Sequence, residues 1–358
     1  MTDHLQSRAT WVKMMAAFLA IYVLWGSTYL AIKVVVQTAP PLSAAGVRFV
    51  LAGTIVYCWA RLRGAPKPSS KQCVNLGLLG LLMFVPGYAA LFWAERLIPS
   101  GLAAVLIATL PLWTVLVEAG VFKRRRVTPM LAFALATGFI GVMLLATGRS
   151  DGAGHAIPLL PCVAVILGEL SWAVASVATR QLDLPSSSML TAGAEMLCGG
   201  IVLLASGAAI GEWHVLPHVT PGALLAMAYL IVAGSIVAFN AYIWLLGRTS
   251  ATRLSSFTYV NPVVALALGY AFGGEHLGAN ALTASLLVLA SVVFVQLATT
   301  RWSPRTDRNG GATPASPSAV GRTPVSPTLR SETPGLLLRR GGRQMLARAA
   351  TGSSYPGG

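Results

Sequence analysis

The sequence predicts an all-α polytopic membrane protein with ten transmembrane helices, arranged as two inverted five-helix repeats. Of its 358 residues, 55% are hydrophobic and only 10% are charged, against about 25% charged in soluble domains. Apolar stretches recur along the chain up to Thr300, and each can cross a hydrocarbon core of about 30 Å. Lipid offers no water to the backbone, so each stretch has to be helical.

Short connections containing proline or glycine separate the apolar stretches, which sets the limits of each element. The first stretch is longer than the apolar region of a cleavable signal peptide, so we expect it to remain as a helix. We expect spans at 14–36, 43–62, 74–94, 101–120, 129–147, 158–179, 188–209, 222–246, 254–273 and 279–298.

Basic residues in the connections indicate the orientation. With the N-terminus inside, the outer connections contain only Arg96 and Arg149. The inner connections contain Arg8, Lys13, Arg61, Arg63, Lys67, Lys71, Lys123, Arg124, Arg125, Arg126, Arg180, Arg248 and Arg253. Under the positive-inside rule, this asymmetry places residues 1–13 and the C-terminus in the cytoplasm and His214 outside. It also explains the net charge of +15 without a nucleic-acid partner.

The composition changes after Thr300. Residues 301–358 are rich in Pro, Ser, Thr, Gly and Arg, with nine arginines and two acidic residues. Such a segment cannot bury enough apolar surface to fold, so we expect a disordered, basic cytoplasmic tail. Weak attraction to anionic lipid head groups is the alternative reading.

An internal duplication divides the spans into repeats at 14–147 and 158–298. A shift of 147 residues superposes Trp25 on Trp172, Lys33 on Arg180, Gly46 on Gly193 and Gly53 on Gly200, and a shift of 151 superposes Pro111 on Pro262. Five spans in each repeat force the second to run upside down relative to the first. In proteins with this plan, ligands bind near the membrane midplane between the repeats.

Several kinds of site lack a sequence signature. Cys58, Cys73, Cys162 and Cys198 show no paired spacing, so no disulfide framework is expected. His214 and His218 share a loop with Pro217, which argues against a helical metal site. No HExxH, GxSxG or phosphate-binding loop is present. We therefore expect no catalytic residues, no metal and no cofactor.

Five segments, taken in order, resemble the EamA family of the drug/metabolite transporter superfamily, and within it the YedA-type exporters. They are LWGSTYLAIK (24–33), PPLSAAGVRFVLAG (40–53), PSGLAAVLIATLPLW (99–113), GSIVAFNAYIWLL (234–246) and TYVNPVVALALGYAFGGE (258–275). The resemblance covers residues 14–298. It implies a ten-helix bundle that moves small metabolites such as amino acids or drugs. The first repeat has Arg124 where the second has Glu275, so we interpret Glu275 as a loop residue.

Ionisable residues inside a span cost about 3 kcal/mol or more, which makes them candidates for function. Arg48 lies in the second span and is expected to hold an anionic group of the substrate. Glu195 matches Arg48 in the other repeat, and Glu169 lies mid-span, so both are candidates for proton coupling. Lys33 lies near a helix end and is expected to reach the interface as an anchor.

Polar and aromatic residues complete the predicted substrate path. Trp25, Ser27 and Tyr29 of the first span, with Trp172 of the sixth, would line the repeat interface and suit an amphipathic or cationic ligand. Asn240 and Asn261 either bind the substrate or form hydrogen bonds between helices. Gly269 and Gly273 form a GxxxG pattern, which indicates close helix packing and leaves a homodimer open.

The leading hypothesis is a secondary transporter in the inner membrane that exports its substrate with a proton or another gradient. A membrane-bound enzyme that acts on a lipid-linked substrate is the alternative. Its catalytic groups would need a place at one face, and the predicted outer loops are short. A sensor or scaffold is a third reading, for which only the tail could serve as an output segment.

Overall fold

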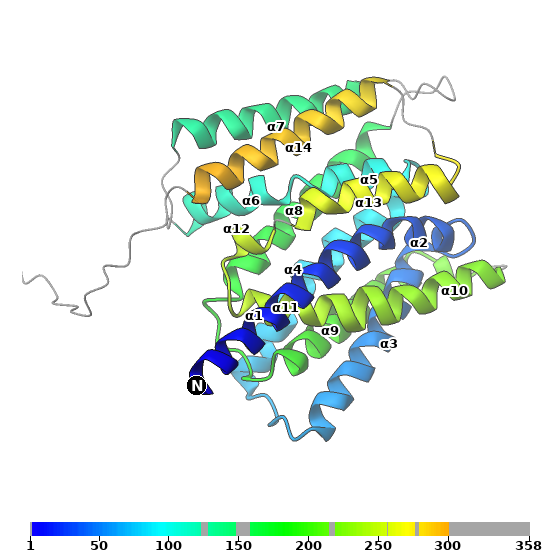
Figure 1. Cartoon of the computed structure of the whole chain (residues 1–358). Coiled ribbons are helices and arrows are strands. Elements are labelled where there is room, and N and C mark those ends of the chain that lie inside the picture. Colours follow the sequence, from blue (N-terminus) through cyan, green and yellow to red (C-terminus); the bar gives the residue numbers. More distant parts are fainter. Residues whose placement is uncertain are drawn as a thin grey trace, which may run out of the picture. The chain divides into compact units, whose positions relative to one another are not determined.

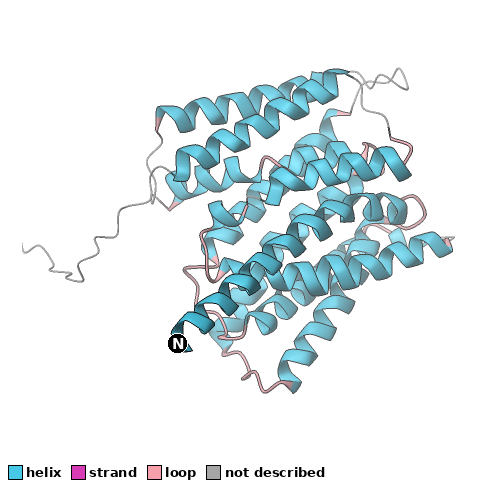
Figure 2. Ribbon diagram, viewed as in Figure 1, coloured by secondary structure: helices cyan, strands magenta, loops and turns pink. Residues whose placement is uncertain are grey.

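The computed structural model describes residues 2–122, 128–147, 158–214, 219–255, 257–275 and 279–300. Every regular element in this part of the chain is a helix (Figure 2). The chain divides into a unit of residues 1–304 and a unit of residues 305–358. The second unit, and with it the predicted disordered tail, lies outside the described residues.

The helices follow one another with few residues between them (Figure 1). Those before residue 150 are α1 (Thr2–Ala20), η1 (Ile21–Trp25), α2 (Gly26–Val36), α3 (Pro41–Leu62), α4 (Ser70–Ala94), α5 (Ser100–Ile107), α6 (Leu110–Leu116), η2 (Val117–Val121) and α7 (Pro129–Thr147). Those after it are α8 (Leu159–Ala178), α9 (Ser188–Ala209), η3 (Glu212–His214), α10 (Pro221–Tyr229), η4 (Leu230–Phe239), α11 (Asn240–Leu246), α12 (Ala251–Leu254), α13 (Phe257–Phe272) and α14 (Ala279–Thr300).

Seven helical stretches within the described residues are long and apolar enough to cross a membrane. They are Thr10–Val36, Pro41–Leu62, Ser70–Ala94, Ser100–Val121, Leu159–Ala178, Ser188–Ala209 and Pro221–Leu246. The chain is therefore a polytopic, helical membrane protein. Helices α7, α13 and α14 occupy the positions of the other three predicted spans, and that these three also cross stays a prediction.

Local sequence explains where the helices begin. Ser69 and Gln72 form a capping box at the start of α4, and Thr220 caps α10 by accepting a hydrogen bond from Ala223 N. Proline occupies the first position of α3 and of α10, where its missing N–H costs no hydrogen bond.

Two prolines interrupt helices in the core. Pro86 lies inside α4, and the carbonyl of Leu82 that it leaves free accepts a hydrogen bond of 2.7 Å from Ser171 Oγ of α8. The fourth predicted span breaks at Ala108 and Thr109 into α5 and α6, with Pro111 in the first turn of α6. Unwound backbone of this kind is tolerated at membrane depth only where protein or a cavity surrounds it.

Helices α3 and α9 approach each other closely through four glycines. A Cβ atom at Gly46 would lie 2.7 Å from Leu204 N, and one at Gly53 would lie 2.6 Å from Leu197 N. In return, Cβ atoms at Gly193 and Gly200 would lie 2.5 and 2.7 Å from backbone N atoms of α3. Only glycine allows this backbone contact, so the spacing that relates the repeats also holds these two helices together.

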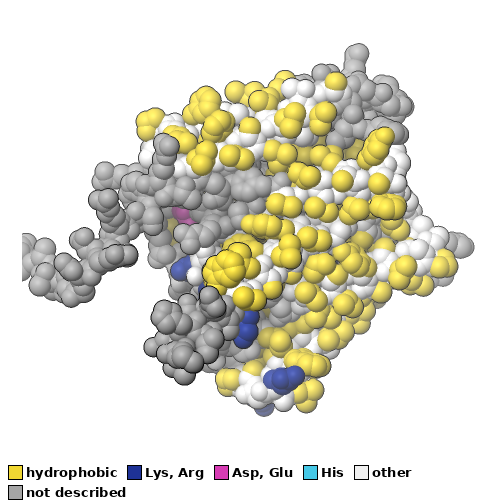
Figure 3. All heavy atoms as spheres, in the orientation of Figure 1, with side chains coloured by type: hydrophobic (Ala, Val, Ile, Leu, Met, Phe, Trp, Pro, Cys, Tyr) yellow, Lys and Arg dark blue, Asp and Glu magenta, His cyan; other side chains and the backbone are white. Residues whose placement is uncertain are grey.

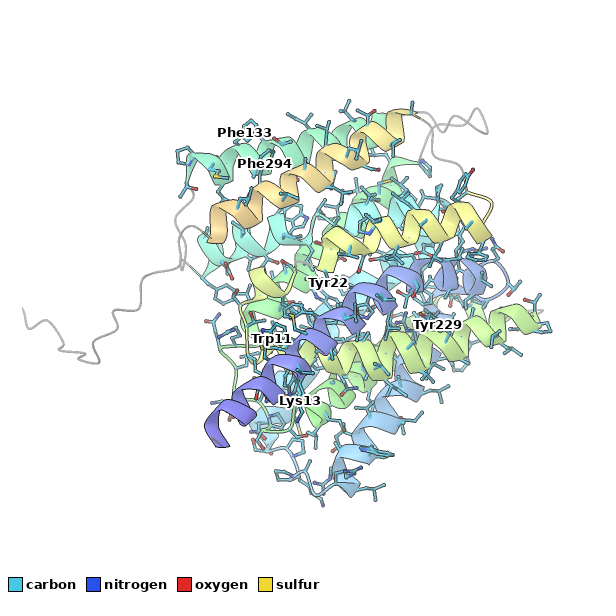
Figure 4. The ribbon with its side chains drawn as sticks, viewed as in Figure 1. Trp11, Lys13, Tyr22, Phe133, Tyr229 and Phe294 are labelled. Carbon is cyan, nitrogen blue, oxygen red and sulfur yellow. The ribbon has the colours of Figure 1, made fainter. Side chains whose placement is uncertain are left out.

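Other helices pair across the two halves of the sequence. Helix α4 packs on α8 and α9, helix α13 packs on α2 and α5, and α14 packs along α7 (Figure 1). Phe133 of α7 and Phe294 of α14 face each other with ring centroids 5.8 Å apart (Figure 4). The two halves are thus interleaved and share one core.

The side chains on the viewed face are sorted by type. Apolar atoms cover most of this surface, and Lys and Arg gather towards the end where α1 begins and α3 ends (Figure 3). Trp59 of α3 and Leu225 of α10 are 52% and 74% exposed. Large exposed apolar side chains are expected where lipid replaces water.

Candidate functional site

A pocket opens at the junction of the interleaved halves. Its walls come from η1, α2, α4, α5, α6, α8 and α13. Its aromatic lining consists of Trp25, Tyr29, Tyr88, Trp172 and Phe257. Among the described residues that line it, Glu169 is the one with an acidic side chain. Such a chamber suits a small molecule with an apolar body.

Contacts between rings fix the shape of this pocket. Trp25 and Trp172 meet edge to face with centroids 6.1 Å apart and planes at 83°. Trp172 donates its indole N–H to the hydroxyl of Tyr242 at 2.9 Å, and that hydroxyl also lies 2.7 Å from Ser176 Oγ. The two tryptophans that the repeat superposes are therefore in contact, and both are held rigidly.

Two π-helical segments position Trp25. It ends η1, and its indole N–H donates to the carbonyl of Gly234 in η4 at 2.9 Å. A π-helix displaces its backbone hydrogen bonds by one residue relative to an α-helix, and such segments often occur at functional sites. The side chain from one half is thereby bonded to the backbone of the other half.

Arg48 lies behind the wall of the pocket. Its side chain is 1% exposed, Nε donates to Ser235 Oγ at 2.9 Å, and Nη1 has no hydrogen-bond partner among the described residues. The guanidinium carbon lies 4.7 Å from the ring centroid of Phe49 and 5.3 Å from that of Tyr88. Arg48 therefore touches Tyr88, which lines the pocket, and does not itself line it in this arrangement.

The two candidate coupling carboxylates have different surroundings. Glu169 is 7% exposed and lines the pocket with Trp25 and Trp172. Glu195 is fully buried in α9, and neither of its carboxylate oxygens has a hydrogen-bond partner among the described residues. Its backbone carbonyl lies 2.6 Å from where a Cβ of Gly80 would be, so α4 packs tightly over it.

The remaining predicted site residues are distributed around the pocket. Tyr29 lines it, whereas Ser27 is not part of its lining, and its Oγ lies 2.6 Å from the hydroxyl of Tyr229 in α10. Thr28, one residue further, lines the pocket instead. Asn261 is 1% exposed. With its side-chain amide oriented so that the nitrogen faces the carbonyls of Tyr22 and Phe257, it donates hydrogen bonds to them at 3.0 and 3.1 Å.

Asn240 belongs to a different cavity. Its Nδ2 donates to Ile236 O at 2.6 Å, and it lines a polar recess together with Lys13, Ser188 and Arg248. Lys13 lies in the second half of α1 (Figure 4). This recess is at the basic end of the molecule, away from the aromatic pocket.

Glu275 is more than a loop residue. Its carboxylate accepts hydrogen bonds from Ser100 N at 2.8 Å, Ser100 Oγ at 2.9 Å and Gly101 N at 3.2 Å, which caps the N-terminus of α5. Gly269 of the GxxxG pattern lies against this carboxylate, and Gly273 lies against Leu30, so both contact their own chain. Glu212 caps α3 in the same way, through Leu42 and Ser43.

Lys33 is half-buried and is bonded to a turn of its own chain. Its ammonium donates to the carbonyl of Ile98 at 2.9 Å, in the turn between α4 and α5. Glu95, which begins that turn, is 0% exposed. Sequence reasoning did not select Glu95, because it follows the predicted span and precedes the exposed Arg96.

Metal ligands are not grouped in the described part of the chain: no three His, Cys, Asp or Glu residues come together there. His218 lies outside the described residues. The residues that enclose the pocket are aromatic and aliphatic, apart from Thr28 and Glu169. This arrangement can bind an organic molecule through stacking, cation–π contact and one carboxylate.

Comparison with known proteins adds family evidence to this geometry. The model of the EamA-like transporter family matches residues 12–147 and again residues 159–297. Over 283 residues the chain is 36% identical to the uncharacterized inner membrane transporter YedA of Escherichia coli K12, covering 78% of this chain and 90% of that protein.

Two further similarities are more distant. A Salmonella typhimurium protein named "Probable amino-acid metabolite efflux pump" is 27% identical over 283 residues, covering 76% of this chain and 91% of its own. A solved structure described as "Crystal structure of protein" superposes with a TM-score of 0.58 at 20% identity, covering 80% of this chain and 98% of that one. The last similarity concerns the fold alone.

Proposed function

Because this chain belongs to the EamA-like transporter family, we propose that it is a secondary transporter that exports small amphipathic metabolites by alternating access. Membership of this family sets aside the enzyme hypothesis, since the relatives above are named as transporters or efflux pumps. A location in the bacterial inner membrane, with both termini in the cytoplasm, is part of the proposal. The name of YedA and the distribution of basic residues support it.

The pocket carries the proposal for the substrate. Trp25 and Trp172 offer aromatic faces and edges, and Glu169 adds the carboxylate of the described lining. Aromatic faces attract an ammonium group, and a carboxylate inside the same chamber strengthens that preference. Amino acids and cationic drugs have an ammonium group beside an apolar body. The name of the Salmonella relative supports the first of these classes.

We propose that ten helices form two inverted repeats of five. The family model matches the chain twice, which supports a duplication. The glycines of α3 and α9 meet crosswise, because Gly46 lies near the carbonyl of Gly200, and Gly53 near that of Gly193. Crosswise contact is the pattern expected for two matching helices related by a two-fold axis. Rocking of one repeat against the other would then expose the pocket to either side in turn.

Proton coupling through Glu195 and Glu169 completes the proposed mechanism. Intramembrane carboxylates commonly form proton relays in transporters. Glu169 lies where a substrate would bind, so protonation and substrate could compete for it. Glu195 is sealed against α4, so a proton would reach it only after the helices move.

Counterflow in liposomes tests the proposed function directly. Purified protein is reconstituted into vesicles loaded with an unlabelled amino acid or cationic drug, and uptake of the labelled compound is measured. We expect uptake above that of empty vesicles for at least one ammonium-bearing compound. Absence of counterflow for both classes would contradict the proposed substrates.

Matched tryptophan variants locate the path. Trp172→Ala should abolish counterflow because it removes a wall of the pocket and the partner of Tyr242. Trp59→Ala is the control, because Trp59 is 52% exposed on the outside of α3. Equal counterflow in the two variants would place the substrate elsewhere.

A further inference from the structure

Four charged side chains from four parts of the fold come together where α4 turns into α5. Glu95 follows α4 as its C-cap, Lys33 comes from α2, Arg48 from α3, and Glu275 from the segment after α13. The cluster adjoins the pocket, because Ile32, which precedes Lys33, and Leu91, one turn before Glu95, both line it. Any opening of the pocket at this end would rearrange the cluster.

Three of the four charged groups already have hydrogen-bond partners. Lys33 Nζ donates to Ile98 O, Arg48 Nε donates to Ser235 Oγ, and Glu275 is occupied by the N-terminus of α5. Glu95 differs from them. It is 0% exposed, and neither of its carboxylate oxygens has a hydrogen-bond partner among the described residues. An ionised carboxylate would be costly there, because the backbone N–H and the charge of Lys33, together with the charge of Arg48, replace only part of its lost hydration.

The titratable groups that face Glu95 come from every element around it. They are Lys33 and Tyr29 of α2, Arg48 of α3, Glu275, and Tyr88 of its own helix, which lies towards Arg48. Burial raises the pKa of the Glu95 carboxyl well above its ordinary value. The charge of Glu275 adds to this rise, and the charges of Lys33 and Arg48 oppose it.

We propose that Glu95 is a proton-binding site that controls opening of the transport path at the α4–α5 turn, an inference that rests on the proposed transport function. In the closed arrangement, Glu95 carries the proton and Lys33 holds the turn through the carbonyl of Ile98. Release of the proton to water leaves a carboxylate that attracts the ammonium of Lys33. Lys33 then leaves Ile98, and the turn between α4 and α5 is freed from α2.

The sign of the pH effect follows from the two states. In the open state Glu95 is hydrated and its pKa is that of a free Glu, about 4.3. In the closed state its pKa is raised, so the closed state binds the proton more tightly. Raising the pH between these two values therefore favours opening, by up to about tenfold per pH unit for one proton. Above the closed-state pKa, Glu95 is ionised in both states, and a further rise in pH no longer shifts the equilibrium between them.

A buried reporter cysteine measures this opening without any substrate. Ile98→Cys is introduced into a background in which the four native cysteines are replaced, because Ile98 is 1% exposed in the turn itself. Its rate of alkylation by a maleimide is measured in detergent from pH 5 to 9. Each rate is divided by that of Leu97→Cys, whose parent residue is 51% exposed, which removes the intrinsic pH dependence of the thiol.

The rate ratio should rise with pH when Glu95 is present and be flat in Glu95→Gln. Glu95→Asp keeps a titratable group and should restore the rise. Lys33→Met removes a charge that lowers the pKa of Glu95, so it should shift the midpoint to higher pH. Glu212→Gln is the matched control, because it removes a carboxylate that caps α3 and does not line the pocket, and it should leave the rise intact.

A flat ratio with Glu95 present, or an unchanged rise in Glu95→Gln, would overturn the proposal. A purely structural role for Glu95 would not move the midpoint in Lys33→Met, so an unmoved midpoint also counts against it. The assay requires no flux. Absence of counterflow with a pH-dependent ratio would therefore contradict the transport function alone, and counterflow with a flat ratio would contradict the gate alone.

Discussion

Arg48 of α3 is a fully buried cation whose guanidinium is only partly hydrogen-bonded. The sequence predicts that it holds an anionic group of the substrate. In the structure Ser235 binds its Nε, and Tyr88 separates it from the pocket. The acidic side chain in its electrostatic surroundings is Glu95. Its Nη1 has no hydrogen-bond partner among the described residues, and that it binds a substrate carboxylate stays a prediction.

Substitutions of Arg48 should distinguish the contribution of its positive charge from that of its planar hydrogen-bonding group. Arg48→Gln removes the positive charge beside Tyr88 and should lower counterflow of a zwitterionic amino acid about tenfold, equivalent to about 1.4 kcal/mol of binding. Arg48→Lys keeps the charge and loses the planar fork, so an intermediate value is expected. Counterflow by both variants at the level of the unaltered protein, at equal expression, would remove Arg48 from the substrate path.

Glu195→Gln should uncouple transport from the pH gradient. A carboxyl group can carry a proton across the cycle and an amide cannot, while the two have nearly the same shape. Flux driven by a pH gradient should be lost, and substrate binding and counterflow should persist. Glu169→Gln should have the smaller effect on coupling.

The measurement is uptake into vesicles with and without an imposed pH gradient. If Glu195→Gln responds to the gradient like the unaltered protein, Glu195 is not the coupling site. A larger effect of Glu169→Gln would assign coupling to the carboxylate that lines the pocket.

The sequence predicted residues whose role depends on position along a helix, and it missed those whose role depends on a distant contact. Trp25, Tyr29, Trp172 and Glu169 were selected from mid-span position, and all four line the pocket. Glu95 lies at the end of its helix, and its neighbours come from distant parts of the chain, namely Lys33, Arg48 and Glu275. No local pattern reports such an approach.

The same contrast holds for the helices: their limits were predicted, and the irregular segments within them were not. The predicted span limits match the described helices closely, because apolar length alone determines them. The break between α5 and α6 and the π-helical segments η1 and η4 were not predicted. Pro111 lies at this break, but the extent of the break depends on what packs around the freed carbonyls. Periodicity does not contain that information.

The contact between α3 and α9 gives a prediction at the scale of the element. Gly53→Ala would place a methyl group 2.6 Å from Leu197 N, so the two backbones must separate. We expect a lower midpoint of thermal unfolding in detergent, by a loss of about 1–3 kcal/mol. Gly77→Ala in α4 is the control, because no atom lies within 4 Å of its added Cβ. It should be neutral or stabilising by up to about 1 kcal/mol.

Thermal unfolding monitored by circular dichroism compares the two variants. An equal midpoint for Gly53→Ala and the unaltered protein would show that the helices tolerate a wider spacing.

For the whole molecule, the basic residues predict its orientation. Arg63 follows α3 at the basic end and should face the cytoplasm, whereas Leu97 in the α4–α5 turn should face outward. Arg125, a second expected cytoplasmic marker, lies outside the described residues. Single cysteines at positions 63 and 97 are labelled in intact cells with a membrane-impermeant reagent. We expect labelling at position 97 alone. Labelling at position 63 would contradict the predicted orientation.

Truncation tests the extent of the folded unit. The contact-defined unit ends at residue 304, and residues 301–358 contain no apolar stretch that could span a membrane. Deletion after Thr300 should therefore leave membrane insertion and counterflow unchanged within about twofold. Loss of inserted protein would assign a structural role to the tail.

The glycine contacts between α3 and α9 also have a consequence during synthesis. The partner of Gly46 is made about 150 residues later, which takes roughly 7 to 30 s at 5–20 residues per second. During that interval the nascent chain presents a bare glycine face of α3 to lipid, with no helix to fill it. A membrane quality-control protease that recognises loosely packed helices would have this interval in which to act. Slowing translation between residues 60 and 190 should therefore lower the yield of inserted protein, even though every codon specifies the same amino acid.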